Sequence, residues 1–219
     1  MVKRLFDVAC AGAALLVTAP LLGIAAIGIK LTDPGPVLYR ARRVGYLGRR
    51  FTMYKLRTMR HVPPARSGAR ITAAADTRIF RFGQLLRRTK IDELPQLVNV
   101  LRGDMAIVGP RPEDPAIVKR HYRATHYATL GVKPGLASPG SLYQFVQGDA
   151  LLGHDPETGY VTKVLNTKLA LDLVYIRHAS LRHDLAIIGR TMWLIGATIA
   201  GRRRFGPLPE MAEARRLLA

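Results

Sequence analysis

The chain has 219 residues, with 34 Lys and Arg against 15 Asp and Glu, which gives a formal net charge of +19 and a pI near 11.0. This charge excludes an ordinary neutral cytosolic enzyme and predicts a polyanionic partner: nucleic acid, an anionic membrane, or a nucleotide and phospholipid substrate. Apolar residues make up 48% of the chain, which excludes a disordered basic tail. The length fits one domain with an appendage, and the single cysteine, Cys10, excludes a disulfide framework.

An uncharged stretch from residue 8 to residue 29 is long and apolar enough to be a membrane helix, because about 20 apolar residues cross the hydrocarbon core of a bilayer. A cleaved signal peptide is one alternative. The stretch exceeds the apolar region of such peptides, roughly 7–15 residues, and Asp7 stands where their cationic leader continues. A membrane segment is therefore the better interpretation.

Two features bear on how this segment meets the membrane. Pro20 has no backbone N–H to donate, so a kink or break is expected there. Basic residues flank both ends, with Lys3 and Arg4 before the segment and Lys30 after it, and such residues favour the cytoplasmic side. A bent helix that enters one leaflet and returns satisfies both flanks. Proline also occurs in spanning helices, so both arrangements stay open on these grounds.

The segment after the membrane helix predicts a small β element. Residues 33–36 (DPGP) form a turn that ends the helix. Residues 37–42 and 51–58 are β-like runs separated by glycines, which is typical of a hairpin. Residues 60–76 are rich in Pro, Gly, Ala and Arg and predict a loop.

The rest of the chain predicts mainly helices. Thr77 is expected to cap a helix that ends near Lys90. A second helix is expected from Asp92 to Gly103, because its apolar residues recur with the spacing of one buried helical face. Further helical patterns cover residues 113–126, 163–178 and 184–200, with an irregular stretch at 131–159 and a basic cluster at 202–204 that suits anionic headgroups.

The stretch 87–113 (RRTKIDELPQLVNVLRGDMAIVGPRPE) carries the most informative set of reactive side chains. An isolated pair such as Asp92-Glu93 at a helix start is ordinarily structural, because acidic residues there cap the helix and favour its dipole. Here Arg87, Arg88 and Lys90 lie directly upstream, and a helix N-terminus is a natural phosphate site. A carboxylate at that place can attack an activated phosphorus when a divalent cation offsets the repulsion between the anions. Glu93 is the natural ligand for such a cation, since Mg²⁺ prefers carboxylate and phosphate oxygens.

The same stretch carries a family resemblance. The motifs in it are residues 92–97 (DELPQL), 99–101 (NVL), 103–105 (GDM) and 108–112 (VGPRP). Together they resemble the signature of the bacterial sugar transferases, monotopic phosphoglycosyl transferases that move a sugar phosphate from a UDP-sugar to polyprenyl phosphate. Further matches in the same order extend over most of the chain: residues 3–7, the apolar segment broken at Pro20, residues 33–36, residues 54–59 (YKLRTM) and residues 171–175 (LDLVY).

The resemblance implies a fold class and a location. The fold class is mainly α with a small β element, in a monotopic membrane protein with an N-terminal re-entrant helix broken at Pro20 and amphipathic interfacial helices. We expect residues 1–32 to form the re-entrant helix, residues 33–205 a cytoplasmic catalytic domain and residues 206–219 a C-terminal tail. The location implied is the cytoplasmic face of the bacterial inner membrane, and the chain is expected to contain only the catalytic core with this helix.

The resemblance also implies roles for individual residues. Asp92 is the nucleophile that forms a covalent phosphosugar intermediate and expels UMP, Glu93 holds Mg²⁺, and undecaprenyl phosphate then collects the sugar phosphate. Substrate binding is expected of Lys55, Arg57, Arg87, Arg111 and Asp172. For Lys55, Arg57 and Asp172, a salt bridge inside the fold is an equal alternative.

The expected partners are a UDP-sugar, undecaprenyl phosphate and anionic inner-leaflet lipids, with no nucleic acid, in an enzyme that initiates surface glycan synthesis. The oligomeric state stays open, with a homodimer among the options. The rival interpretation is a non-enzymatic, membrane-tethered binder of nucleic acid or anionic lipid, motivated by the charge of +19. It gives no reason for the pair Asp92-Glu93, and aromatic residues for base stacking are sparse at 7%.

One region departs from the family pattern. Residues 133–143 (KPGLASPGSLY) keep a Lys-Pro-Gly turn but differ after it, and residues 148–163 have the character of an altered loop. Contacts to sugar or acceptor in relatives therefore do not carry over to residues 136–163. The sequence leaves open which UDP-sugar is used and which glycan pathway is served.

Overall fold

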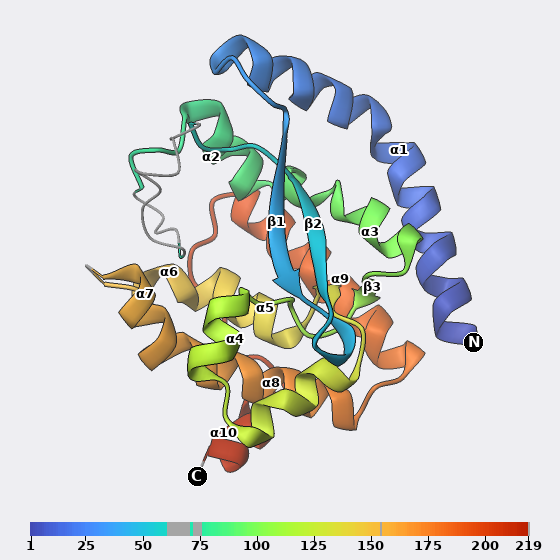
Figure 1. The fold of residues 1–219 in the computed structure, drawn as a ribbon, viewed down its shortest axis with the longest axis vertical. Helices are drawn as coiled ribbons and strands as arrows, with labels where there is room; N and C mark the ends of the chain where they lie inside the picture. The colour runs from blue at the N-terminus through green and yellow to red at the C-terminus, as the bar shows by residue number, and fades with distance from the viewer. Residues whose placement is uncertain (61–70, 72–75, 154, 219) are drawn as a thin grey trace.

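The computed structural model describes residues 1–219 except 61–70, 72–75, 154 and 219, and it is mainly helical (Figure 1). The helices in chain order are α1 Val2–Thr32, α2 Arg81–Arg88, α3 Gln96–Arg102, α4 Pro115–His121, α5 Pro139–Tyr143, α6 Asp149–Leu151, α7 Pro156–Gly159, α8 Leu165–Arg177, α9 Leu181–Ile199 and α10 Met211–Leu218. Short 3₁₀ turns cover Tyr46–Gly48, Ile91–Glu93 and Ala124–Gly131, and π-helical turns cover Gln144–Gly148 and Tyr160–Val164. The strands are β1 Leu38–Val44, β2 Arg50–Leu56, β3 Ala106–Val108 and β4 Gly135–Ala137. The expectation of a mainly α protein with a small β element is confirmed.

The strands form two separate two-stranded sheets. β1 and β2 are antiparallel, with Leu38 opposite Leu56 and Val44 opposite Arg50, so the predicted hairpin is confirmed. β3 and β4 are short parallel strands that pair Ala106 with Gly135. In Figure 1 the hairpin lies in front of the helices, and α3 and α9 are seen between the hairpin and α1.

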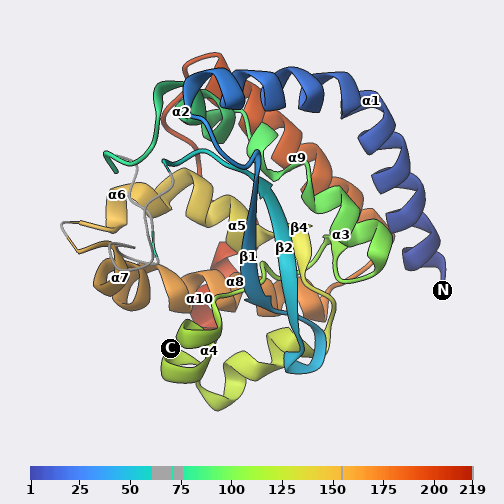
Figure 2. The ribbon, with the colours of Figure 1, turned by 45° about the horizontal axis from the view of Figure 1, so that its top comes forward.

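The apolar helix α1 bends part-way along its length but is continuous through Pro20 (Figures 1 and 2). The bend is therefore confirmed, whereas the expected break is wrong. Proline removes only one backbone hydrogen bond, which a helix of this length tolerates with a bend. Among the described residues, α1 is the helix long and apolar enough to cross a membrane, with little of its apolar stretch buried inside the protein.

Both ends of α1 pack on the same domain. At its start, Arg4 donates hydrogen bonds to the carbonyl oxygens of Val100 (2.6 Å) and Leu101 (2.9 Å) at the end of α3. Lys3 Nζ lies 2.6 Å from Asp184 Oδ2 on α9. Near its end, Ile29 is buried against Leu56, Phe80 and Leu86. The helix thus lies along one side of the protein instead of projecting away from it (Figure 2). Side chains such as Leu16 in its middle stay exposed.

Three neighbouring apolar clusters hold the fold together. One surrounds α8 and includes Leu169, Val174 and, from α10, Met211. The second joins α1, α3, β3 and α9 around Val100 and Ile187. The third is the cluster at the end of α1. Residues 206–219, expected as a tail, therefore contain a helix, α10, whose Met211 and Ala214 are buried against the core.

Several helix starts differ from the sequence-based expectation. Thr77 does not cap a helix: α2 begins after Phe80, because Ile79 pairs with Met59 in an isolated β-bridge and Asp76 holds the backbone N–H of Arg78. α3 begins after Pro95 and not at Asp92, although Gly103 ends it in the left-handed conformation as expected. Residues 113–126 are divided between α4 and a 3₁₀ turn. The expected loop at 60–76 lies almost entirely outside the described residues.

The stretch 131–159, expected to be irregular, contains β4, α5, α6, α7 and a π-helical turn. Ser138 caps α5 by accepting a hydrogen bond from the backbone N–H of Ser141. Asp155 caps α7 in the same way through the N–H groups of Glu157 and Thr158. These helices are shorter than three turns, so their apolar spacing is too brief to be recognised as a helical period.

The contact between α2 and the segment just after β2 depends on a residue without a side chain. A Cβ at Gly83 would lie 2.2 Å from the carbonyl oxygen of Thr58. We expect Gly83→Ala to lower the free energy of unfolding by about 1–3 kcal/mol, since either α2 or the segment around Thr58 must move. Urea unfolding in detergent micelles, followed by circular dichroism, measures the change.

The matched control is Gly189→Ala in α9, where a Cβ meets no atom within 4 Å. This substitution is expected to leave stability unchanged or raise it by up to about 1 kcal/mol, because alanine favours the helix over glycine. Equal effects of the two substitutions would contradict the close packing of α2 on Thr58.

Candidate active site

A cleft of about 2230 Å³ opens between the β1–β2 hairpin, α2 and the C-terminal half of α9. Sites for one small ligand usually hold roughly 300–1,000 Å³, so this cleft has room for more than one. It brings together residues that the sequence singled out: Lys55, Arg57, Arg87, Asp92, Glu93 and Arg111. Asp172, the other expected binding residue, is fully buried and lies outside the lining of the cleft.

A tight turn places Asp92 and Glu93 at the cleft. Lys90 adopts the left-handed conformation, with φ 59° and ψ 13°, which redirects the chain at the end of α2. Ile91–Glu93 then forms a 3₁₀ turn, and Pro95 separates this turn from α3. Non-glycine residues occupy this conformation at a cost, which is typical of functional sites. The pair is therefore a separate turn in front of α3, and Asp92 does not cap that helix.

The carboxylate of Glu93 is held by three cationic side chains. Arg111 forms two hydrogen bonds with it, at 3.0 Å from Nη1 to Oε2 and 2.6 Å from Nη2 to Oε1. Lys55 Nζ lies 3.1 Å and Lys90 Nζ 3.5 Å from Oε1. Burial alone would raise the pKa of Glu93, but Arg111, Lys55 and Lys90 hold it well below its usual range. Glu93 is thus a fixed negative charge at the base of the cleft.

Asp92 is in a different electrostatic state from its neighbour. It is buried, and its Oδ1 has no hydrogen-bond partner among the described residues. Burial and, secondarily, the charge of Glu93 raise the pKa of Asp92, against the opposing effect of Lys55, Lys90 and Arg87. A buried carboxylate oxygen without a partner costs free energy, so its presence in a cleft marks a position with a functional use.

Lys55 and Arg111 reach Glu93 from two different segments of the chain. Lys55 lies on β2, where burial lowers its pKa to about 8 despite the charge of Glu93. Arg111 lies between Pro110 and Pro112, which restrict its backbone. Its burial opposes the charged form, but the ion pair with Glu93 outweighs burial and raises the pKa of Arg111. Both cations can offset the charge of an anionic ligand.

Asp172 is fully buried and makes its contacts inside the protein. Its Oδ1 accepts a hydrogen bond from the backbone N–H of Gly140 at 3.0 Å, whereas its Oδ2 has no hydrogen-bond partner among the described residues. Burial raises the pKa of Asp172 to about 6, against the charge of Lys168 and the nearby hydrogen-bond donors. Asp172 therefore holds the start of α5. The interpretation of Asp172 as a residue inside the fold suits this geometry better than substrate binding.

Arg57 and Arg87 differ in the freedom of their guanidinium groups. Arg57 lines the cleft but is paired with both the carboxylate and the backbone carbonyl of Asp33, which ties the 33–36 turn to β2. The guanidinium of Arg87, on α2, forms no hydrogen bond or ion pair with any residue that the structure describes. Arg87 is thus available for a ligand, whereas Arg57 is engaged within the protein.

Sequence reasoning missed a buried polar cluster beside the Arg111 turn. Lys168 Nζ lies 2.7 Å from Glu113 Oε2 and 2.8 Å from the Tyr160 hydroxyl, which also donates to Glu113. The pKa of Glu113 is about 2, because Lys168 and Tyr160 outweigh its burial. The available signal was two charged residues one helical turn apart, Lys168 and Asp172, among the apolar residues of α8.

The site fits Mg²⁺ only together with an anionic ligand. Among the described residues, Glu93 Oε2 accepts one hydrogen bond, from Arg111, and Asp92 Oδ1 accepts none, so each has capacity for a cation. However, the cationic side chains around the pair outnumber the two carboxylates, and no cluster of three metal-ligating side chains occurs in the described part of the chain. A bare cation is therefore disfavoured, whereas a cation accompanied by a diphosphate is not.

Comparison of the sequence with known proteins shows the family. The sequence model described as "bacterial sugar transferase" matches residues 1–197. The chain belongs to the bacterial sugar transferase family. The match ends within α9, so the bacterial sugar transferase signature includes Asp92, Glu93 and Arg111 but excludes residues 198–219.

Individual relatives of this bacterial sugar transferase have related names. It is 39% identical over 192 residues to a UDP-glucose:undecaprenyl-phosphate glucose-1-phosphate transferase of Xanthomonas campestris pv. campestris, covering 85% of this chain and 37% of that protein. A protein of the same name from Caulobacter vibrioides is 40% identical, covering 87% of this chain and 68% of the relative. A UDP-N-acetylgalactosamine-undecaprenyl-phosphate N-acetylgalactosaminephosphotransferase of Aeromonas hydrophila is 34% identical, covering 87% of this chain and 43% of the relative. The chain thus spans little more than a third of the Xanthomonas protein and about two thirds of the Caulobacter protein.

The burial of Asp172 predicts a pH-dependent stability. Its ordinary pKa of 3.8 rises to about 6 in the folded protein, so the folded state binds the proton more tightly than the unfolded state. Wild-type stability contributed by this group is complete below about pH 4 and is lost as the pH rises towards 6. Asp172→Asn keeps a hydrogen-bond acceptor for Gly140 and removes the titration. The variant is therefore expected to gain about 3 kcal/mol relative to the wild type between pH 4 and pH 7.

Urea unfolding of both proteins across this pH range measures the difference. A difference that stays constant with pH would show that the carboxyl group does not titrate in this way. A difference that moves in the opposite direction would show that Asp172 is stabilised as the anion, contrary to the geometry described above.

Proposed function

We propose that this protein transfers a sugar phosphate from a UDP-sugar to undecaprenyl phosphate, forming undecaprenyl-diphospho-sugar and UMP. The observation that carries the proposal is the pairing of two unlike carboxylates: Glu93, fixed as an anion by Arg111, Lys55 and Lys90, and Asp92, buried with an unpartnered oxygen. The names of the relatives support undecaprenyl phosphate as the acceptor, and they include both glucose and N-acetylgalactosamine as the sugar.

In the first half-reaction, an Asp92 carboxylate oxygen attacks the phosphorus that carries the sugar. The bond from that phosphorus to the bridging oxygen breaks, and UMP leaves with the bridging oxygen. Burial makes the Asp92 carboxylate more basic, and basicity favours its attack on phosphorus. Arg111, Lys55 and Arg87 are placed to neutralise the diphosphate, so that two anions can approach each other.

In the second half-reaction, a phosphate oxygen of undecaprenyl phosphate attacks the same phosphorus, and the bond to Asp92 breaks. The carboxylate is restored, and the bond between the sugar and its phosphate oxygen stays intact throughout. One transfer between two anionic substrates is thereby divided into two displacements at a fixed carboxylate. The cleft volume of about 2230 Å³ is consistent with a donor site and an acceptor site side by side.

Mg²⁺ is proposed to bind with the diphosphate, held by Glu93 and Asp92 on the protein side. When bound, it withdraws charge from the phosphoryl oxygens and the leaving UMP.

The free enzyme is expected to show no saturable Mg²⁺ binding below millimolar concentration, and to bind Mg²⁺ when UDP is present, because the cations around Glu93 repel a bare ion. Calorimetric titration with and without UDP measures this, and micromolar binding of Mg²⁺ alone would contradict it.

For the membrane, we propose that α1 enters one leaflet of the bacterial inner membrane from the cytoplasmic side and returns. Its bend, its exposed apolar side chains and the docking of both of its ends on one domain support this arrangement. A straight span would carry one end of α1 away from the domain, at the expense of the contacts at Ile29 or at Arg4. Anionic inner-leaflet lipids are then the natural partners of the excess positive charge.

The nucleophile is tested with Asp92→Asn in the full chain. The amide is a poor nucleophile of similar shape, so turnover is expected to fall by at least about 10³-fold with no loss of folding. Intact-protein mass spectrometry of the wild type with UDP-sugar and no acceptor is expected to show a sugar-phosphate adduct on Asp92. Glu213→Gln on α10 is the control, because Glu213 pairs with Arg177 and His178 away from the cleft, and it should keep wild-type UMP release.

Full activity of Asp92→Asn would contradict the mechanism, and an adduct on another residue would move the nucleophile. If no UDP-sugar from a panel gives UMP release while the chain binds nucleic acid with a steep dependence on salt, the non-enzymatic alternative holds instead.

A further inference from the structure

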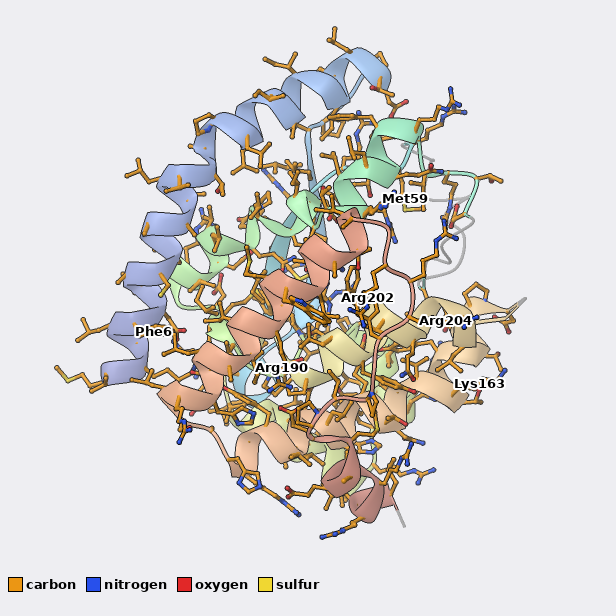
Figure 3. The ribbon with its side chains drawn as sticks, turned by 180° about the vertical axis from the view of Figure 1, so that it is seen from behind. Phe6, Met59, Lys163, Arg190, Arg202 and Arg204 are labelled. Carbon is orange, nitrogen blue, oxygen red and sulfur yellow. The ribbon has the colours of Figure 1, made fainter. Side chains whose placement is uncertain are left out.

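The last part of the chain lies outside the match to the bacterial sugar transferase family and forms a strap beside the cleft. We define the strap as residues 200–210, between α9 and α10. Figure 3 shows it returning along α9 towards α10, with Arg202 close to α9 and Arg204 farther along the strap. Arg202, Arg203 and Phe205 line the same cleft as Asp92, whereas Arg204 is not part of its lining.

The strap is firmly attached at its far end. Arg190 of α9 donates two hydrogen bonds of 2.7 Å to the carboxylate of Glu210, and His183 Nε2 lies 3.0 Å from the same group. Met211, the next residue, is buried in the cluster around α8. At the near end, Arg88 of α2 donates to the carbonyl oxygens of Thr198 (3.0 Å) and Ile199 (3.3 Å). The strap is thus held between two anchored ends and is not a free tail.

Arg202 is held in place with donors to spare. Its guanidinium lies over the rings of Trp193 at 5.4 Å and Phe205 at 5.7 Å, and its Nε donates to the Arg204 carbonyl at 3.1 Å. No partner for its two terminal amino groups, or for the guanidinium of Arg203, occurs in the part of the chain that the structure describes. A stacked guanidinium with free terminal N–H groups is suited to a phosphate, because little entropy is lost on binding.

Apolar side chains accompany these arginines. Ile188, Met192 and Ile195 of α9 line the cleft next to the strap, and Met192 is 65% exposed. α2, whose Arg88 holds the end of α9, also packs against the membrane helix, because its Leu86 shares an apolar cluster with Ile29. Positive charge beside an apolar wall, one short helix away from the membrane helix, matches a phosphate monoester attached to a long hydrocarbon chain.

We infer that the strap forms the acceptor end of the cleft, where Arg202 and Arg203 bind the phosphate of undecaprenyl phosphate while Met192 and its apolar neighbours contact the first isoprene units. This inference rests on the proposed function and adds a second set of phosphate-binding residues, separate from Arg111, Lys55 and Arg87 at the donor. Two anionic substrates would then each have their own cations in one cleft.

The test separates the two half-reactions in full-length protein in lipid nanodiscs. Arg202→Ala combined with Arg203→Ala is expected to raise the KM for undecaprenyl phosphate about tenfold or more, since charge-assisted hydrogen bonds to the phosphate are lost. The burst of UMP released from UDP-sugar without acceptor should keep its wild-type size and rate. Arg203→Ala alone, which leaves the ring stack intact, is expected to give a smaller rise in the same KM.

Arg204→Ala is the matched control, with the same charge removed from the same strap outside the cleft, and it should keep the wild-type KM. Co-sedimentation with phosphatidylglycerol vesicles that lack acceptor distinguishes the acceptor phosphate from bulk lipid headgroups, and the double variant should bind them as Arg204→Ala does. An unchanged KM, an equal effect of Arg204→Ala, or a loss confined to vesicle binding would each overturn the inference and leave the proposed function in place. A wild type without a UMP burst would instead overturn the proposed function, and this inference with it.

Discussion

The arrangement of the site depends on one buried negative charge, the carboxylate of Glu93, which three cations neutralise. Glu93 is accessible over only 8% of its surface, and an anion in that position is stable only because Arg111, Lys55 and Lys90 surround it. These partners come from three separate segments: the turn between two prolines, strand β2 and the left-handed residue after α2. The ion cluster therefore connects the segments that line the cleft, and it also sets the charge that a ligand meets there. Its cations are also those that a diphosphate would meet, so structural and functional roles fall on the same groups.

Two further buried polar contacts hold the segments around this ion cluster in place. Asp172 holds the start of α5 through the backbone N–H of Gly140, and the Glu113, Tyr160 and Lys168 cluster joins the segment just after Arg111 to α8. Neither contact reaches the carboxyl group of Asp92, but the second one fixes the chain two residues after Arg111. Buried charge networks of this kind are costly unless fully paired, which makes them effective at defining one geometry. The helix α8 thus positions the site from the side opposite the hairpin.

The sequence predicted most of the long elements and most of the residues that meet in the cleft, for a physical reason. The hairpin, α8, α9 and the end of α3 at Gly103 follow from periodicity, turn residues and a glycine in the left-handed conformation. Thr77 and Asp92 were misjudged as helix starts because their local cap propensity was outweighed by a β-bridge at Ile79 and by Pro95. The motifs and the charge pattern pointed to Asp92, Glu93, Lys55 and Arg111, but they gave no distances between these residues. The internal pairing of Arg57 with Asp33, and of Lys168 with Glu113, depends on contacts between residues far apart in the chain, which one sequence does not reveal.

The cationic side chains at the cleft fall into two groups, those paired with a carboxylate of the protein and those without such a partner. Lys55, Lys90 and Arg111 are compensated by Glu93, and Arg57 by Asp33, so these cations hold the protein together before any ligand arrives. Arg87, beside Asp92, and Arg203, on the strap, line the same cleft without such a carboxylate partner among the described residues. Because uncompensated cations inside a shared cleft repel one another, their proximity is favourable only when anions occupy the space between them. An enzyme that brings two phosphate-bearing substrates to one carboxylate, as proposed for this chain, needs that excess, and the β1–β2 hairpin, α2 and the C-terminal half of α9 enclose it.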